Sequence, residues 1–355
     1  MSLKFTTVSE LLGHGFDTVI DVRSPAEFAQ DHVPGAINMP VLDNDERARV
    51  GTIYKQQSPF MARKLGAALV FRNAAAHVEL SLSHHDGGWR PLVYCWRGGQ
   101  RSGAFAWMLN QIGWRSDVIE GGYRTYRRLV NAMLYDDPLP YRFIALDGYT
   151  GTAKTELLNL AGLRGTQVLD LEACAAHRGS LLGGRNDIQP SQKAFESRLA
   201  AKLCRFDPSR PVLVEAESSK IGERILPPSL WTALCTAPRI EVSAPIAART
   251  RYLVRAYDDI LSDRENLETK LSFLRRFRGN AVVDGWNDLI AAGDKPGVTR
   301  ALMEQHYDPA YEKSRRVNAH AYSARIDLPD LAAEKLTHAA DRLAQIVDRW
   351  DGDAG

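Results

Sequence analysis

Two glycine-rich segments, each following an apolar run and preceding a helical pattern, constrain the fold of this chain more than any other feature. The first, CWRGGQRS (95–102), begins within the apolar run PLVYCW (91–96). The second, GYTGTAKT (148–155), follows FIALDG (143–148). A buried strand that turns through glycines into a helix is the repeating unit of parallel α/β sheets. The sequence therefore predicts two α/β parts in one chain.

The length of 355 residues agrees with two domains. The segment DDPLPY, with two prolines and two acids, is the predicted linker. The predicted division is a first α/β domain at 1–135 with a helical insertion near 42–90, the linker at 136–141, a second α/β domain at 142–330, and a C-terminal amphipathic helix at 331–355. The stretch from Pro245 to about 320 is expected to be helical and rich in arginine.

Composition excludes several classes of protein. Lysine and arginine total 45 against 43 acidic residues, so net charge argues neither for nor against a nucleic-acid partner. Four cysteines are too few for a disulfide scaffold. The N-terminal segment has no signal-peptide core, and no apolar run reaches the roughly 18 residues needed to span a bilayer. We therefore expect a cytoplasmic protein with no membrane contact.

Cys95 lies where a nucleophilic thiolate is expected, at the end of a strand and before a helix. Inward-pointing backbone N–H groups, the N-terminus of the helix, and the charges of Arg97 and Arg101 are expected to lower its pKa. The remaining residues of this anion-binding loop are Trp96, Gly98, Gly99, Gln100 and Ser102. Cys174, Cys204 and Cys235 lack such surroundings, and we interpret them as packing residues.

The second glycine-rich segment has the strand–loop–helix context of a Walker A phosphate loop. Its predicted diphosphate-binding residues are Gly148, Tyr149, Thr150, Gly151, Thr152, Ala153, Lys154 and Thr155. Lys154 can reach phosphate oxygens, and the Thr155 hydroxyl suits Mg²⁺. Ala153 stands where the usual pattern has glycine, and its Cβ is expected to strain the loop. This departure argues against ATP hydrolysis more than against phosphate binding.

Acidic and polar residues further along the chain are predicted to complete the phosphate site. The strand VLVEAES (212–218) resembles a Walker B strand, with Glu215 or Glu217 near the metal. Asp170 ends another predicted strand, on the side where ligands of open α/β sheets bind. The possible accessory residues in and after that strand are Asp170, His177, Arg178 and Ser180.

The loop from Cys95 to Arg101 has seven residues, and this length leaves two classes of enzyme open. DVRSPAEF, DHVPGAINMP and the cysteine loop resemble a rhodanese domain, in which a cysteine carries sulfur as a persulfide. The sulfurtransferase loops used for comparison have six residues. Seven residues with this cysteine–arginine spacing are also typical of cysteine phosphatases and arsenate reductases. A larger loop suits a larger anion, such as a phosphate ester or selenophosphate.

A rhodanese-like domain followed by a P-loop domain resembles the tRNA 2-selenouridine synthase family. The most specific segments are ERARVGTIYKQ, CWRGGQRSGAFAWML, IEGGYRTYRR, DLEACAAHRGSLLG and VEAESSKIG. The resemblance extends from DVRSPAEF to about HYDPAYEKSRR (306–316). It implies a tRNA with 2-thiouridine at the wobble position as partner, selenophosphate as selenium donor, and geranyl diphosphate as the source of an S-geranyl intermediate.

The resemblance also implies roles for individual residues. Cys95 would hold selenium as a selenylsulfide, while Arg97, Arg101 and the loop amides bind selenophosphate. We interpret the segment from Gly148 to Thr155 as the cradle for the diphosphate, with Mg²⁺ assisting its departure. No tightly bound cofactor is expected.

Arginines in the helical region are predicted tRNA contacts, interleaved with aromatic residues that suit base stacking. They are Arg249, Arg251 and Arg255, interpreted as one helical face, and Arg275, Arg276 and Arg278. A solvated helical surface explains the same pattern equally well, because acidic residues share the stretch.

Two other functions compete with the selenium transferase. A cysteine phosphatase or arsenate-reductase-like enzyme with an appended nucleotide-binding domain would explain the loop length. A non-catalytic sensor would explain the domain pairing but not the intact Cys95 and Arg101. The sequence leaves the oligomeric state, the choice of tRNA and the role of the insertion open.

Overall fold

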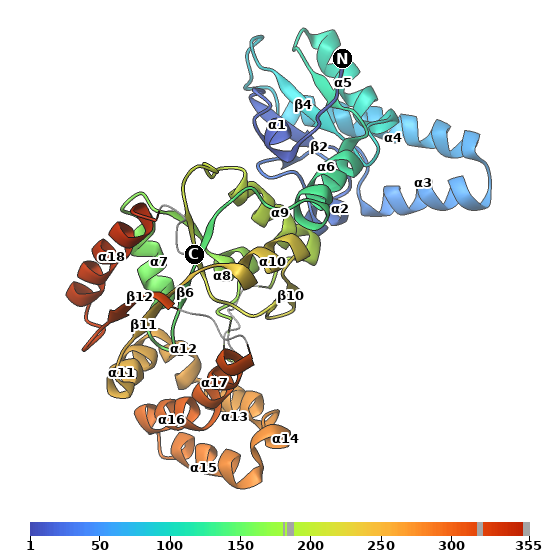
Figure 1. Cartoon of the computed structure of the whole chain (residues 1–355). Helices are drawn as coiled ribbons and strands as arrows, with labels where there is room; N and C mark the ends of the chain where they lie inside the picture. Colours follow the sequence, from blue (N-terminus) through green and yellow to red (C-terminus); the bar gives the residue numbers. More distant parts are fainter. Residues whose placement is uncertain (180–181, 183–187, 318–321, 351–355) are drawn as a thin grey trace. The chain divides into compact units, whose positions relative to one another are not determined.

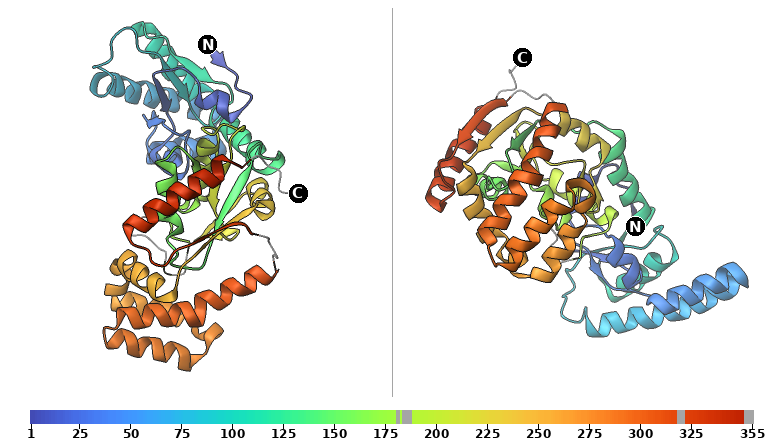
Figure 2. Two further views of the ribbon diagram at one scale, coloured as in Figure 1. Left: turned by 60° about the vertical axis from the view of Figure 1, so that its left-hand side comes forward. Right: turned by 90° about the horizontal axis from the view of Figure 1, so that it is seen from below.

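The computed structural model describes residues 1–179, 182, 188–317 and 322–350 (Figures 1 and 2). The chain forms two compact units. Unit 1 comprises Met1–Pro138 with Pro190–Arg205, and unit 2 comprises Leu139–Gln189 with Phe206–Gly355. Each unit contains one five-stranded parallel sheet, as the α/β prediction requires.

The sheet of unit 1 has the order β1-β5-β4-β2-β3, and every neighbouring pair is parallel. Its strands are β1 (Ser2–Leu3), β2 (Thr18–Asp21), β3 (Ile37–Asn38), β4 (Pro91–Tyr94) and β5 (Asp117–Ile119). All four residues of β4 are buried, because central strands of a parallel sheet are covered on both faces. The helices following β2, β4 and β5 begin just after their strands, which brings their N-termini to the carboxyl edge of the sheet.

The helices of unit 1 connect these parallel strands. They are α1 (Val8–Leu12), α2 (Pro25–Gln30), α3 (Asn44–Gln56), α4 (Pro59–Leu80), α5 (Gln100–Ile112), α6 (Gly122–Asn131), the π-helical turn η1 (Ala132–Asp136) and α9 (Gln192–Leu203). Buried residues of α5, including Phe105 and Leu109, pack with Ile20 and Val93 of the strands.

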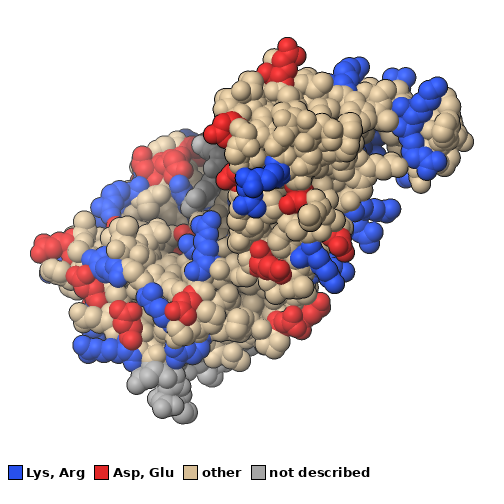
Figure 3. All heavy atoms as spheres, turned by 90° about the horizontal axis from the view of Figure 1, so that it is seen from above, with Lys and Arg blue, Asp and Glu red and all other residues tan. Residues whose placement is uncertain are grey.

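The predicted helical insertion is present as a hairpin of α3 and α4. Asp43 caps α3 by accepting from the Glu46 N–H at 2.7 Å, and Pro59 occupies the first turn of α4. No acidic residue occurs between Arg47 and Val78. The hairpin surface is therefore basic, and Figure 3 shows lysine and arginine side chains at its end, on the right of that view.

The helix α9 departs from the predicted domain division, which placed it in the second domain. It belongs to unit 1, where Glu196 pairs with Arg127 of α6 and accepts a 2.8 Å hydrogen bond from the Tyr135 hydroxyl. The Ser191 hydroxyl before it bonds to the Gln30 carbonyl. The chain therefore passes between the units three times, after residues 138, 189 and 205.

The sheet of unit 2 has the order β12-β11-β6-β8-β7, again all parallel. Its strands are β6 (Phe143–Asp147), β7 (Gln167–Leu169), β8 (Val212–Glu215), β11 (Arg239–Ser243) and β12 (Tyr322–Asp327). The fully buried β6 lies at the centre, so the phosphate loop that follows it emerges between β8 and β11. A separate two-stranded hairpin joins β9 (Lys220–Ile221) to β10 (Arg224–Ile225).

The helices of unit 2 are distributed between the sheet and a helical subassembly. They are α7 (Lys154–Gly162), α8 (Leu171–Ala175), α10 (Pro228–Thr236), α11 (Ile246–Ala256), α12 (Asp258–Ser262), α13 (Arg264–Ser272), α14 (Arg275–Arg278), α15 (Asn280–Ala291), α16 (Lys295–Leu302), the π-helical turn η2 (Met303–Tyr307), α17 (Asp308–Val317) and α18 (Ala333–Asp348). Residues of α12, α13, α15 and α16 share one apolar core around Trp286, and these helices are orange in Figure 2.

The C-terminal helix α18 packs against the sheet of unit 2. Leu336, Ala340 and Leu343 join Leu157 of α7 and Ile326 of β12 in one core. The predicted amphipathic helix is therefore present as an integral part of this unit. No helix among the described residues is long and apolar enough to cross a membrane.

Candidate functional site

Cys95 lies directly after β4, in a loop that turns into α5. Gly98 has φ = 62°, and a Cβ on it would lie only 2.5 Å from the Ile119 carbonyl oxygen. Only glycine fits this position, because a side chain would collide with backbone that cannot move aside. The N–H of Tyr123 bonds to the Cys95 carbonyl at 2.8 Å and the Arg124 N–H bonds to the Trp96 carbonyl at 3.1 Å, so the start of α6 holds the loop.

The surroundings of the Cys95 sulfur favour the thiolate. The side chain is 3% exposed, and burial by itself raises the thiol pKa. The Ser102 hydroxyl, which donates to Sγ at 3.2 Å, outweighs that effect together with the Arg101 charge and the backbone N–H groups of Ser102 and Arg97. The pKa of Cys95 therefore lies below its ordinary value, in the direction that the sequence predicted.

Glu27 of α2 is a member of this site that the sequence did not indicate. Its carboxylate accepts from Arg101 Nη1 at 3.1 Å and from the Ser24 N–H at 3.1 Å. Glu27 thus orients the Arg101 guanidinium, whereas the exposed Arg97 is linked to the sulfur through its backbone N–H. The signal in the sequence was the position of Glu27 in the helix after β2, at the same edge of the sheet.

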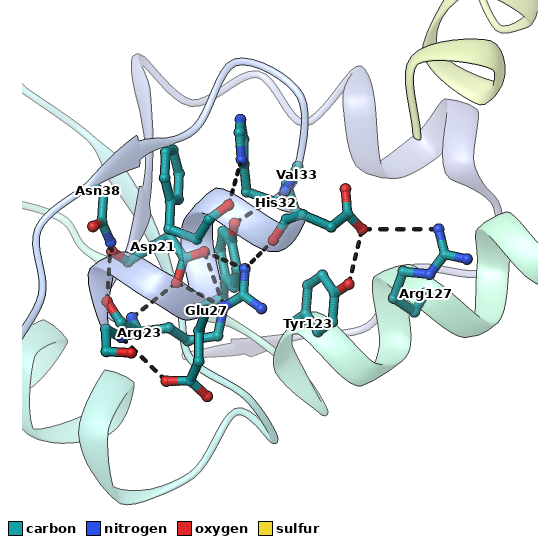
Figure 4. Close-up of polar contacts among 12 residues, drawn as sticks. Asp21, Arg23, Glu27, His32, Val33, Asn38, Tyr123 and Arg127 are labelled. Atoms are coloured by element: carbon teal, nitrogen blue, oxygen red, sulfur yellow. Dashed lines mark hydrogen bonds and ion pairs between the residues drawn. The ribbon is translucent and has the colours of Figure 1, made fainter. Parts of the chain in front are cut away.

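A buried charge network lies beside Glu27 and fixes the β2–α2 turn (Figure 4). The Arg23 guanidinium forms a two-point ion pair with Asp21, at 3.0 and 2.6 Å, and donates to the Asp31 carbonyl at 2.6 Å. Its Cζ lies 3.9 Å from the centre of the Tyr123 ring, and the Tyr123 hydroxyl donates to Asp31 at 2.8 Å. The network connects β2, α2 and α6 below the cysteine loop.

We expect the Ser102→Ala variant to shift the pH profile of Cys95 alkylation to higher pH. Removing a donor to the thiolate raises the thiol pKa, so a higher pH is needed to reach the same thiolate fraction. The measurement is the rate of reaction with iodoacetamide from pH 5 to 10, followed on the Cys95 peptide by mass spectrometry. The exposed Cys235 is the internal reference, and an unchanged Cys95 profile would contradict the assigned role of Ser102.

The exposure of Cys235 also corrects the interpretation of all three remaining cysteines as packing residues. Cys174 and Cys204 are partly buried, but Cys235 lies on the surface at the end of α10. The apolar residues of the short helix α10 do not show which side of its last turn is buried. The sequence therefore did not determine whether Cys235 faces the core or solvent.

The phosphate loop has the predicted strand–loop–helix geometry, and Ala153 carries the predicted strain. Ala153 has φ = 59° and ψ = 31°, in the left-handed region that costs an L-residue about 1–2 kcal/mol. Its methyl is 4% exposed and lies in the core with α7 and α18, which offsets part of that cost. The Lys154 ammonium donates to the Gly148 carbonyl at 2.7 Å, at the mouth of the loop.

Three carboxylates meet beside the Thr155 hydroxyl. Oxygens of Glu172, Glu215 and Glu217 lie within 4.8 Å of one another, and Thr155 donates to Glu215 at 2.6 Å. Burial first, and then repulsion among the carboxylates, raises the pKa of Glu172 to about 9 and that of Glu215 to about 7. Burial also raises the pKa of Glu217. The sequence indicated Glu215 and Glu217 but missed Glu172.

This cluster fits a hard divalent cation. Glu215 Oε2 is buried without a hydrogen-bond partner, and the neighbouring donors are hydroxyl and carboxylate oxygens, which Mg²⁺ prefers. Thr155 and Glu215 would hold the ion directly beside the phosphate loop, with Glu172 and Glu217 as further oxygen donors.

The predicted accessory residues serve different purposes. Asp170 caps α8 by accepting from the Ala173 N–H at 2.7 Å, a structural role. The Gly179 N–H bonds to His177 Nδ1 at 3.1 Å, and a Cβ on Gly179 would lie 2.7 Å from a Glu172 oxygen, so this backbone closes over the carboxylates. Arg178 pairs with Asp259 at 3.2 Å and, like Gly179, lines the cavity around the phosphate loop. Ser180 lies outside the described residues.

A cavity of about 830 Å³ surrounds the phosphate loop. The loop, the carboxylates, Arg178 and a group of aromatic side chains line it. The aromatic residues are Trp231, Tyr252, Tyr257, Tyr307, Tyr311 and Tyr322. The volume and the mixed lining are typical of a small-molecule site.

The predicted tRNA contacts do not share one surface, and Arg249 is not available to phosphate. Arg249 is 6% exposed, pairs with Asp308 at 2.9 Å and donates to the Thr150 carbonyl at 3.1 Å, so it supports the phosphate loop. Residues two positions apart on a helix point in nearly opposite directions, and the interpretation of one face was therefore wrong for Arg249. Arg251 and Arg255, four positions apart, are exposed.

The second arginine group is also divided. Arg275 pairs with Asp284 at 2.7 Å, and Arg278 donates to the His306 ring at 3.0 Å and to its carbonyl at 2.9 Å. Arg276 is exposed, with its guanidinium 4.5 Å from the centre of the exposed Phe277 ring.

Two family models match this chain, and one solved structure shares part of its sequence. A rhodanese-like domain model matches residues 5–129, and a model described as the tRNA 2-selenouridine synthase AAA domain matches residues 141–275. A Clostridium difficile structure described as the N-terminal domain of a putative ATP/GTP binding protein is 33% identical over 37% of this chain and 98% of its own, with a TM-score of 0.31.

Two curated relatives are described as tRNA 2-selenouridine synthase. The Nitrosomonas europaea protein is 38% identical over 67% of this chain, and the match covers 63% of that protein's own length. The Hahella chejuensis protein is 31% identical, with 93% of this chain and 94% of the relative covered. A near full-length match of this kind, together with both domain models, shows that this chain belongs to the tRNA 2-selenouridine synthase family, which modifies tRNA.

Proposed function

We propose that this protein replaces the C2 sulfur of wobble 2-thiouridine by selenium from selenophosphate, through an S-geranyl intermediate made from geranyl diphosphate. The observation that carries the proposal is the presence of two different anion sites. One contains an activated thiolate, and the other joins a phosphate loop to an aromatic cavity. The two proposed steps use two anionic substrates, selenophosphate and geranyl diphosphate, and each substrate needs a site of its own.

The selenium step takes place at Cys95. The loop N–H groups and Arg101, oriented by Glu27, bind selenophosphate, and the buried thiolate attacks phosphorus. The sulfur–phosphorus bond forms as the selenium–phosphorus bond breaks, and that electron pair leaves with selenium as selenide. The selenide attacks C2 and displaces the S-geranyl group as a thiolate, while water breaks the sulfur–phosphorus bond, releases phosphate and restores the Cys95 thiolate.

The alkylation step takes place at the phosphate loop. Lys154 and the loop N–H groups hold the diphosphate, so that its carbon–oxygen bond breaks as the thiouridine sulfur bonds to C1 of the geranyl chain. Mg²⁺ bound at Thr155 and Glu215 would stabilise the charge of the departing diphosphate. Alkylation converts the C2 sulfur into a thiol leaving group, which selenium can displace.

In this proposal the substrate is a cytoplasmic tRNA, and its phosphates require exposed cationic side chains on the protein. Arg251, Arg255 and Arg276 meet that requirement, and Phe277 offers a stacking surface next to Arg276. The exposed basic residues Arg49, Lys55, Arg63 and Lys64 of the α3–α4 hairpin are further phosphate contacts in this proposal.

Mass spectrometry of wobble nucleosides tests the two steps. The protein is incubated with 2-thiouridine tRNA and geranyl diphosphate alone, selenophosphate alone, or both. We expect S-geranyl-2-thiouridine in the first incubation and 2-selenouridine only in the third. We expect the Lys154→Ala variant to bind the diphosphate about thirtyfold more weakly or worse, because removing one partner of a charged contact costs at least about 2 kcal/mol.

The exposed Lys335→Ala variant is the matched control for loss of a lysine in unit 2, and it should behave as the wild type. Undiminished diphosphate affinity in Lys154→Ala would overturn the role of the phosphate loop. Unchanged 2-thiouridine in all three incubations, with turnover of an aryl phosphate dependent on Cys95, would favour the phosphatase alternative.

A further inference from the structure

A second, apolar cavity adjoins the phosphate loop inside unit 2. It lies among α11, α12, α16 and η2, and little of its lining is polar. Six of its residues do not line the larger cavity, and they form its inner part: Leu182, Ile260, Leu261, Thr299, Leu302 and Met303. Leu302 and Met303 are 3% and 0% exposed, so both side chains are buried, and the apolar cavity has a volume of about 40 Å³.

The two cavities share part of their lining at the phosphate loop. Thr150, Leu253, Tyr257 and Tyr307 line both of them. A Cβ on Gly151 would lie 2.7 Å from Leu253 Cδ1, so the loop backbone passes directly over the wall of the apolar cavity. A ligand whose phosphates lie on the loop therefore has the apolar cavity next to it.

The lining of the inner part selects the chemistry of what enters. Leu182, Ile260, Leu302 and Met303 offer no hydrogen bond to the edge of a nucleobase, which would lose its bonds to water on entry. A hydrocarbon chain has no such cost, and each methylene moved from water into the cavity improves the dissociation constant by about fourfold. The site is thus matched to a molecule with a diphosphate head and an apolar tail.

We infer that the apolar cavity receives the end of the hydrocarbon chain of the diphosphate substrate, and that Leu302 and Met303 limit the chain length. The inference rests on the proposed function for the diphosphate itself and adds the specificity-determining residues. Among the six inner residues only Thr299 has a polar side chain, and its buried hydroxyl has no hydrogen-bond partner.

Calorimetric titration of the full chain in Mg²⁺ tests the inference with inorganic diphosphate, geranyl diphosphate, farnesyl diphosphate and adenosine diphosphate. We expect wild type to bind geranyl diphosphate at least tenfold more tightly than inorganic diphosphate, and more tightly than farnesyl diphosphate. Met303→Ala enlarges the cavity and should shift the preference toward the longer chain. A higher affinity for farnesyl diphosphate in this variant cannot result from misfolding.

Two further variants separate packing from folding effects. Leu302→Asn places an amide in the cavity and should weaken geranyl diphosphate at least tenfold while inorganic diphosphate binds as before. Thr299→Val replaces the hydroxyl by a methyl of similar size and should leave geranyl diphosphate binding equal or tighter.

The outcomes distinguish this inference from the proposed function. If wild type binds neither diphosphate compound, the assignment of the phosphate loop fails. If it binds inorganic and geranyl diphosphate equally, or if Met303→Ala leaves the chain-length preference unchanged, only the chain site is overturned. Tighter binding of adenosine diphosphate than of geranyl diphosphate would overturn it in favour of a nucleotide.

Discussion

We expect replacement of Cys95 by serine to lower the rate of 2-selenouridine formation by about a thousandfold or more, while S-geranyl-2-thiouridine still forms and accumulates. The serine hydroxyl is not ionised near neutral pH, so it is a far weaker nucleophile toward selenophosphate. The backbone of the anion loop and the contact between Glu27 and Arg101 do not depend on the sulfur. The phosphate loop, in the other unit, keeps all its residues.

Nucleoside mass spectrometry over time, with both substrates present, measures this effect. Cys235→Ser is the matched control, because it changes an exposed cysteine distant in sequence from the loop. If Cys95→Ser forms 2-selenouridine at the wild-type rate, Cys95 is not the nucleophile that releases selenium from selenophosphate. If it loses the S-geranyl product as well, the assignment of the two steps to separate sites is wrong.

The second large effect concerns stability. We expect Arg23→Leu to destabilise unit 1 by about 3–5 kcal/mol, because it leaves the Asp21 carboxylate buried without its countercharge. Arg23 and Asp21 are 1% and 0% exposed, so water cannot replace the lost contacts. The variant also removes the guanidinium from the Tyr123 ring and from the Asp31 carbonyl.

Hydrogen exchange of β2 and β4 peptides in increasing urea measures the unfolding of unit 1 separately from unit 2, which a whole-chain probe would not resolve. The exposed Arg63→Ala variant is the control and should change stability by less than about 0.5 kcal/mol. The double variant Asp21→Leu with Arg23→Leu should recover part of the loss, because both charges are gone. A cost below about 1 kcal/mol for Arg23→Leu alone would contradict this account.

Much of the fold follows from apolar runs that only a buried strand explains. The runs at 91–94 and 143–147 are buried strands, and the glycine-rich segments after them are the two loops. Ala153 replaces the glycine of the usual phosphate-loop pattern, and the predicted strain is present because its backbone lies in the left-handed region. Local sequence determines these features because each depends on a few neighbouring residues.

Contacts between distant segments could not be predicted in the same way. Glu27 reaches Arg101 across 74 positions, and Glu172 joins Glu215 only because β7 and β8 are neighbours in the sheet. Arg249 was interpreted as a surface residue since arginines usually are, but Asp308 provides a buried partner for it. Strand order and long-range pairing decide these positions.

The membership of α9 in unit 1 affects how the two units can be separated or recombined. Although α9 follows the phosphate loop in the sequence, it belongs to unit 1, where its Glu196 pairs with Arg127. A polypeptide ending at the predicted linker would lack this helix and leave Arg127 and Tyr135 without the carboxylate that they contact. Neither unit is therefore one contiguous stretch of the sequence. A chimera with a relative, joined once at the linker, would not exchange a whole unit.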